Sequence, residues 1–181
     1  YAALIDEEVR PVFRRWQERA ISEALLVPQV VYGYFKCQAE ENDLLVWPEV
    51  DDGVPTGEPV RFIFPRQPTG RRLCVADFFR DAQSGQYDTV AFMLATVGPK
   101  ASEFAGEMFK ANEYREYLHF HGFGVEVVEA LAELWHKRVR EELGIADHDA
   151  TEVRKLFAQG YQGSRYAFGY PACPDLEQQT G

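Results

Sequence analysis

The sequence lacks any apolar run close to the roughly 18 residues that a membrane-spanning helix needs. Its first residues also lack the basic, then apolar, then small-residue order of a secretory signal. Only three cysteines occur in 181 residues, Cys37, Cys74 and Cys173, and none forms a C-x-x-C pair. An odd, widely spaced set argues against a disulfide framework and against a zinc ribbon. These absences predict a cytoplasmic protein that has no membrane partner.

Positive charge is scarce as well. The chain has 19 Lys and Arg against 29 Asp and Glu, for a formal net charge of -10. A surface that grips nucleic acid needs clustered basic residues that release counterions. The short basic pairs, Arg14-Arg15, Arg71-Arg72 and Lys137-Arg138, are interpreted as solvated helix faces and turns. We therefore predict no nucleic-acid partner.

Several motifs of catalysis are absent. Residues 122–124, Gly-Phe-Gly, could begin a dinucleotide loop, but Val127 stands where the third glycine is required. This segment is interpreted as a corner between two helices. There is no P-loop and no G-x-S-x-G elbow. His119 and His121 lack the further close Cys or His that zinc requires. We predict no catalytic residue and no metal ligand.

The hydrophobic pattern predicts an α+β fold, a mainly antiparallel sheet with helices packed on it. Residues 89–98 form a continuous apolar run, which predicts a strand buried on both faces. The loop of residues 51–59 is rich in Gly and Pro. Strands are expected at 30–38, 43–48, 60–65 and 89–98, and helices at 4–26, 100–120, 125–143 and 149–158. With no internal repeat and no second core, residues 1–181 are expected to form a single domain.

The predicted helix at 125–143 carries two stripes at helical spacing. One is apolar and is expected to face the core. Beside it lies a row formed by Glu126, Glu129, Glu133 and His136. The row is either plain solvated surface or the wall of a cleft, where Glu129 or Glu133 would receive an amine or a ribose hydroxyl.

The segment of residues 163–175, GSRYAFGYPACPD, combines parts suited to binding. The guanidinium of Arg165 can pair with a carboxylate through two parallel hydrogen bonds. Gly169 allows close approach to the backbone, and Tyr170 offers a ring for stacking. Pro171 and Pro174 stiffen the loop, so less entropy is lost on binding. By chemistry alone, a structural turn is an equally good interpretation.

The run Arg165-x-x-x-Gly169-Tyr170-Pro171-Ala172-Cys173-Pro174, preceded by Tyr161-Gln162-Gly163, resembles the signature of the activation domain of cobalamin-dependent methionine synthase. The stretches at 73–79 (LCVADFF), 91–98 (AFMLATVG) and 125–144 resemble other parts of that domain in the same order. The resemblance covers essentially the whole chain. It implies a twisted, mainly antiparallel sheet edged by helices. The resemblance also leads us to expect a core fragment that is truncated at both ends.

The resemblance further implies a function. In that family the domain binds S-adenosylmethionine, whose methyl group restores methylcobalamin after the cofactor has been oxidised to cob(II)alamin. The parent enzyme is a methyltransferase that makes methionine from homocysteine and methyltetrahydrofolate. The implied partners are a separate cobalamin-binding domain of the same parent chain and an electron donor, flavodoxin or a reductase. The fragment alone is expected to be inactive.

Site roles follow from the same resemblance, residue by residue. Arg165 is expected to bind the methionyl carboxylate, and Gly169, Tyr170 and Ala172 are expected to form the wall beside the nucleoside. Glu129 falls where the family has a carboxylate near the ligand. The Asp-x-His-x-x-Gly signature of cobalamin binding is missing, so this chain is not expected to hold cobalamin by itself.

Two other classes of function stay open on sequence grounds. One is a non-catalytic interaction module of the same fold, whose loop at 163–175 docks a protein partner. The other is a stand-alone enzyme that uses Glu129, Glu133 and His136.

Overall fold

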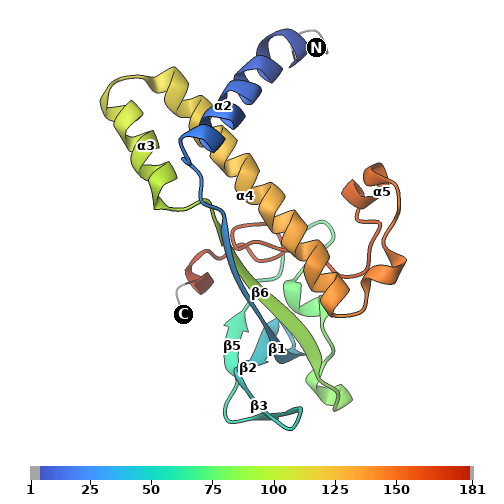
Figure 1. Ribbon diagram of the computed structural model, residues 1–181. Helices are drawn as coiled ribbons and strands as arrows, with labels where there is room; N and C mark the ends of the chain where they lie inside the picture. The colour runs from blue at the N-terminus through green and yellow to red at the C-terminus, as the bar shows by residue number, and fades with distance from the viewer. Residues whose placement is uncertain (1–4, 180–181) are drawn as a thin grey trace. The chain divides into compact units, whose positions relative to one another are not determined.

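The computed structural model describes residues 5–179. Its helices and strands follow one another along the chain as Figure 1 shows. The helical elements are η1 (Ile5–Val9), α2 (Arg10–Ser22), η2 (Val75–Phe78), η3 (Ala82–Ser84), α3 (Pro99–Lys110), α4 (Tyr114–Glu142), η4 (Ala146–His148), α5 (Val153–Phe157) and η5 (Glu177–Gln179). The strands are β1 (Gln29–Glu40), β2 (Asp43–Trp47), β3 (Glu49–Asp51), β4 (Val54–Thr56), β5 (Val60–Ile63) and β6 (Asp88–Thr96).

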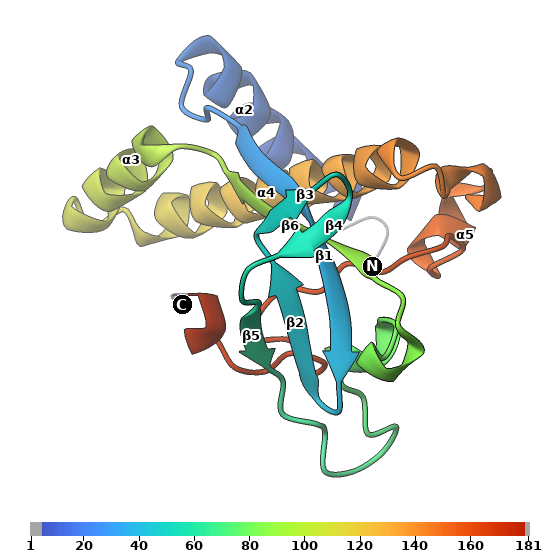
Figure 2. The ribbon, with the colours of Figure 1, turned by 90° about the horizontal axis from the view of Figure 1, so that it is seen from below.

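The main sheet has four strands in the order β5-β2-β1-β6. β2 pairs antiparallel with β1 on one side and with β5 on the other, as Figure 2 shows face-on. The short connection at Glu41-Asn42 allows this pairing, since antiparallel strands can be joined by a tight turn. The predicted α+β class, with a mainly antiparallel sheet, is confirmed.

By its contacts the chain divides into two compact units. One comprises residues 1–31 and 93–144, and the other comprises residues 32–92 and 145–181. We call them the helical unit and the sheet unit, after the elements that dominate each. The boundary falls inside β1 and inside β6, so both strands contribute to both units.

The helical unit has its own core, built by α2, α3 and α4. Trp16 is its largest side chain and is 1% exposed. Its ring lies 5.0 Å from that of Phe120 and 6.3 Å from that of Phe104. Pro11 stands in the first turn of α2, where its missing N–H costs no hydrogen bond. Leu4, where this helix was expected to begin, lies outside the described residues.

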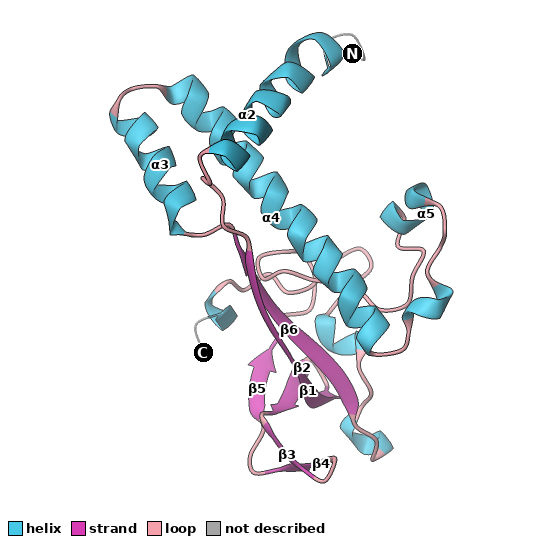
Figure 3. Ribbon diagram, viewed as in Figure 1, coloured by secondary structure: helices cyan, strands magenta, loops and turns pink. Residues whose placement is uncertain are grey.

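The sheet unit has a second core that joins the sheet to loops distant in sequence. The buried members are Cys37, Ala39, Leu44, Val46, Phe64, Cys74, Val75, Ala76, Ala172 and Cys173. Ala172 and Cys173 belong to the C-terminal segment, most of which Figure 3 draws as loop. The C-terminal loop therefore contributes to this core although most of it has no regular secondary structure.

The predicted break between the two long helices was wrong. α4 begins at Tyr114 and runs through residues 122–124, and the turn comes earlier, at Asn112 with φ +60°. Asparagine tolerates this left-handed conformation, which commonly ends helices. A glycine in a helix costs about 1 kcal/mol relative to alanine. Burial of Phe120 and Phe123 on either side of Gly122 offsets that cost.

Two strand predictions also need correction. β6 is half-buried along most of its length and Leu94 is 65% exposed, so it is not covered on both faces. It is an edge strand, whereas a run buried on both faces is typical of a central one. The stretch 51–59 was expected to be loop, but β3 and β4 pair there as a short hairpin around Asp52-Gly53. Both residues have positive φ, as a tight hairpin turn requires.

All three cysteines are buried free thiols. Burial, with a smaller contribution from the nearby Asp88 carboxylate, raises the pKa of Cys37 to about 12. Because the thiolate is the reactive form, we expect iodoacetamide to label Cys37 very slowly in the folded protein near neutral pH. Labelling should become fast in denaturant, where the pKa returns to its ordinary value. Peptide mass spectrometry after a timed pulse would measure both rates, and equal rates would contradict the prediction.

No described helix combines the length and the apolar character needed to cross a membrane.

Candidate functional site

A shallow hollow of about 100 Å³ lies in the C-terminal loop of the sheet unit, and it is lined by Arg165, Tyr166, Ala167 and Tyr170. The hollow thus brings the permanently charged guanidinium of Arg165 together with the rings of Tyr166 and Tyr170. Arg165 is half-buried, while Tyr170 is 57% exposed, so its ring is available at the surface. Sites for ligands of drug size usually enclose about 300 Å³ or more. This hollow can therefore accept only one end of such a ligand.

The loop is closed by its own hydrogen bonds. Gly169 N donates to Cys173 O at 2.9 Å, and Cys173 N donates to Tyr170 O at 2.9 Å. Tyr170 N donates to Ala167 O at 3.2 Å, and the Cys173 thiol also donates to that oxygen at 2.9 Å. These bonds fold residues 167–173 into a compact turn, which is preorganised as a binding loop should be.

Glycine is required at one position of this turn. Gly169 has φ +90°, outside the conformations that side-chain-bearing residues adopt readily. A Cβ there would lie 2.9 Å from Leu176 Cδ2, although Leu176 is exposed and could move. The backbone conformation, more than the space, therefore specifies glycine.

Two rings of the loop pack on rings outside it. Phe168 stacks on the buried Phe64 at 6.4 Å between centroids. Tyr166 packs on Phe78, with 5.2 Å between ring centroids. One ring thus secures the loop to the core while Tyr166 lines the hollow.

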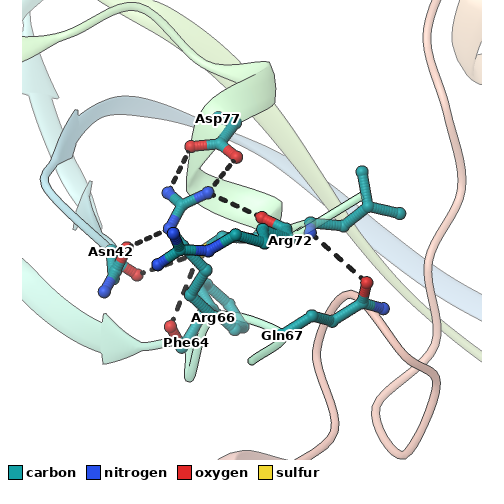
Figure 4. A network of polar contacts seen from close by, with 8 residues as sticks. Asn42, Phe64, Arg66, Gln67, Arg72 and Asp77 are labelled. Carbon is teal, nitrogen blue, oxygen red and sulfur yellow. Dashed lines mark hydrogen bonds and ion pairs between the residues drawn. The ribbon is translucent and has the colours of Figure 1, made fainter. Parts of the chain in front are cut away.

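A polar network braces the neighbouring segment of residues 64–77, and Figure 4 shows Arg66 at its centre. The Arg66 guanidinium makes two hydrogen bonds to the Asp77 carboxylate, at 2.6 and 2.5 Å. It also donates to Asn42 Oδ1 at 3.0 Å and to Arg72 O at 2.9 Å. The two bonds from Arg66 hold the pKa of Asp77 below its usual value. Asp77 is exposed and Arg66 only half-buried, so the ion pair itself adds little stability. Its role is geometric, because Arg66 holds the segment against the turn that joins β1 and β2.

The predicted site residues are placed as follows. Arg165 and Tyr170 line the same hollow. Gly169 lies in the turn next to Tyr170 and is exposed. Ala172 is buried in the sheet-unit core, and its carbonyl accepts a hydrogen bond from Val75 N at 3.1 Å. Glu129 is exposed on α4 in the helical unit.

The carboxylate row on α4 does not form one exposed surface. Glu126, Glu129 and Glu133 are exposed, but His136 is 7% exposed and belongs with the buried side of the helix. Its Nδ1 lies 3.9 Å from Glu133 Oε2. A stand-alone active site built from these groups therefore has no support in this arrangement. Among residues 5–179, no group of three or more His, Cys, Asp or Glu is arranged to hold a metal ion.

Sequence reasoning missed three residues of this region. Tyr166 and Ala167 lie inside the quoted loop, yet no role was assigned to either. Gln67 lies about a hundred residues upstream, and its side chain donates to Pro171 O at 2.8 Å. Nothing in its local sequence, a loop of polar residues with Pro and Gly, indicates so distant a partner.

Comparisons with known proteins agree on one family. Residues 7–181 match the family model described as "Vitamin B12 dependent methionine synthase, activation domain". The methionine synthases of Mycobacterium tuberculosis (strain ATCC 25618 / H37Rv) and Mycobacterium leprae (strain TN) are each 44% identical to the chain over 191 aligned positions. Each alignment covers 99% of this chain and 16% of the relative, so the chain spans about one-sixth of the length of these relatives.

A solved structure is similar as well: "Crystal Structure of the MetH Reactivation Domain bound to AdoHcy". The TM-score is 0.80 at 24% sequence identity, and the match covers 99% of this chain and 59% of the other. At that identity the similarity establishes the fold.

Proposed function

Because this chain belongs to the activation-domain family of vitamin B12-dependent methionine synthases, we propose that it binds S-adenosylmethionine and serves the reductive reactivation of cobalamin. When bound, S-adenosylmethionine supplies a methyl group that, with one electron, converts cob(II)alamin to methylcobalamin and leaves S-adenosylhomocysteine. The related structure, which is described as bound to AdoHcy, supports this ligand class.

The observation that carries the proposal is the meeting of Arg165 and Tyr170 in one hollow. The amino-acid end of the ligand has a carboxylate, and a guanidinium pairs with it through two charge-assisted hydrogen bonds. The hollow's volume of about 100 Å³ suits that end and leaves the nucleoside to lie along the surface. The negative carboxylate of the ligand's amino-acid end therefore complements the positive guanidinium of Arg165 in the hollow.

The remaining residues have roles that follow from their positions. The exposed ring of Tyr170 offers a face against which the ligand can stack. Gly169 leaves the backbone open to close approach, and Ala172 fixes the turn to the core from below. Glu129 is proposed as a carboxylate contact from α4. None of these groups is a nucleophile or a base, so their work is to bind and orient the ligand.

The chain spans only part of its relatives, so the rest of the function is proposed for the parent protein. We propose a methyltransferase that forms methionine, with cobalamin held by a separate domain and flavodoxin or a reductase as electron donor. We also propose that residues 1–181 act as one activation domain, since one family match extends over 7–181. A cytoplasmic location is in keeping with three free thiols.

A titration tests the central claim. We expect S-adenosylhomocysteine to bind the full-length protein saturably at one site, as measured by isothermal calorimetry. Adenosine, which lacks the carboxylate, should bind much more weakly, because it cannot pair with Arg165. Equal binding of the two ligands would contradict the assigned role of Arg165. No binding of S-adenosylhomocysteine would refute the proposal, and binding of a protein partner to the loop in its place would favour the interaction module.

A further inference from the structure

We propose that Gln67 is a positioning residue for the ligand loop, a role that rests on the proposed function. Gln67 does not line the hollow. It lies half-buried in the segment that Arg66 braces (Figure 4), and both polar atoms of its side-chain amide form hydrogen bonds. Nε2 donates to Pro171 O at 2.8 Å, while Oε1 accepts from Leu73 N at 3.3 Å.

The backbone of Gln67 adds a third bond, because its N–H donates to Leu73 O at 3.1 Å. Gln67 is thus paired with Leu73 through both its backbone and its side chain, which leaves its amide group little freedom to turn. The Nε2 donor is therefore presented to the C-terminal loop from a fixed position. The hydrogen bond from Arg66 to Arg72 O joins the same two stretches of chain, since Arg66 precedes Gln67 and Arg72 precedes Leu73.

The acceptor, Pro171 O, sits at a decisive place in the loop. The next carbonyl, Ala172 O, accepts from Val75 N at 3.1 Å. Two consecutive carbonyls of the loop are therefore held by two donors from the segment 67–75. Together they fix the two successive peptide planes that follow Pro171 and Ala172.

Fixing these planes matters because they hold Pro171, the residue directly after Tyr170, and the ring of Tyr170 is itself largely exposed. With 57% of its surface exposed, packing does not determine its direction. The backbone direction at residues 170–171 therefore sets where the ring lies relative to Arg165. A hydrogen bond that already orders the loop in the free protein lowers the conformational entropy that is lost when the ligand binds. Gln67 thus acts on affinity through Tyr170, without touching the ligand.

Two substitutions at this one position separate the two ends of the amide. Gln67→Glu keeps an acceptor for Leu73 N but has no donor for Pro171 O. Gln67→Lys keeps a donor for Pro171 O but has no acceptor for Leu73 N. The same two changes at Gln83, which is exposed in η3, control for the altered charge.

The test measures S-adenosylhomocysteine binding to the full-length protein in all five forms. Relative to the matched Gln83 variants, we expect Gln67→Glu to weaken binding about tenfold, because Pro171 O loses its donor. Gln67→Lys should bind within about twofold of the unsubstituted protein, since it keeps that donor. The reverse order, or equal losses in both variants, would overturn the positioning role, because a general structural effect does not distinguish donor from acceptor.

Hydrogen exchange of the ligand-free protein gives an independent readout. In peptides covering residues 166–175, Gln67→Glu should speed amide exchange while Gln67→Lys should not, because only the former releases the turn. Equal exchange in the two variants would overturn the positioning role of Gln67. Failure of the unsubstituted protein to bind S-adenosylhomocysteine would refute the proposed function instead. The exchange result would then still decide whether Gln67 positions the loop.

Discussion

The Arg165→Ala variant should bind S-adenosylhomocysteine about 10- to 100-fold more weakly than the unsubstituted protein, because it loses a hydrogen bond between two charged groups. The guanidinium is half-buried, so water competes with it less than at an open surface. It lines the hollow together with Tyr170, and the ligand's carboxylate has no other cation among the residues that line it. Isothermal calorimetry on the full-length protein would measure the change.

Two further variants make this result specific. Arg165→Lys should recover only part of the affinity, since an ammonium group cannot form the two parallel bonds of a guanidinium. Arg154→Ala removes the same charge from exposed α5 and should leave binding unchanged. Equal weakening by Arg154→Ala and Arg165→Ala would show that net charge alone acts, and would contradict the assigned contact. Unchanged affinity in Arg165→Ala would contradict it as well.

The Trp16→Ala variant should lose about 3–5 kcal/mol of stability in the helical unit, the cost usual for truncating a buried aromatic ring. Trp16 is 1% exposed and contacts two other core rings, Phe104 and Phe120. Arg15 and Arg19 also lie over its ring, at 5.3 and 5.4 Å from the centroid. Amide exchange in peptides of α2, α3 and α4 should rise by roughly two to four orders of magnitude if these helices open together.

Trp16→Phe is the matched control. Among the described residues the Trp16 indole N–H has no hydrogen-bond partner, so the smaller ring sacrifices area but no bond. We therefore expect a loss clearly smaller than that of the alanine variant. Exchange in peptides of β2 and β5, which belong to the sheet unit, should respond less than exchange in the helices. Unchanged exchange in α3 and α4 of Trp16→Ala would contradict this account of the core.

Periodicity predicted both long helices, because burial of one face leaves a repeat of three and four residues. It failed at residues 122–124, since glycine reads locally as a breaker. The packing of Phe120 and Phe123 outweighed that preference. At Asn112 the tendency to leave the helix met no opposing burial, and the chain turned there.

The strands, like the helices, were only partly predictable from the sequence. Short connections and β-branched residues were enough to predict the antiparallel pairing of β1, β2 and β5. The burial of β6 was not predictable, because an apolar run does not reveal whether its strand lies at the centre or the edge of a sheet.

In the candidate site, chemistry of single residues was readable from the chain. A guanidinium, a glycine and a tyrosine within six positions indicate what kind of ligand end could be bound, and resemblance to a family specified which ligand to test. The hollow itself, shared by Arg165 and Tyr170, depends on how the loop turns. That turn is closed by hydrogen bonds within residues 167–173 and is attached to the rest of the sheet unit by long-range bonds from Gln67 and Val75.

The sequence alone therefore determined the α+β class, the family and the residues able to pair with a carboxylate, because these depend on residue type, order and spacing. Only the tertiary structure decided that Ala172 is buried, that His136 leaves the carboxylate row and that Gln67 reaches Pro171. Such facts depend on which distant segments pack together. The physical reason is that burial and hydrogen bonding between segments about a hundred residues apart leave no periodic trace in either segment.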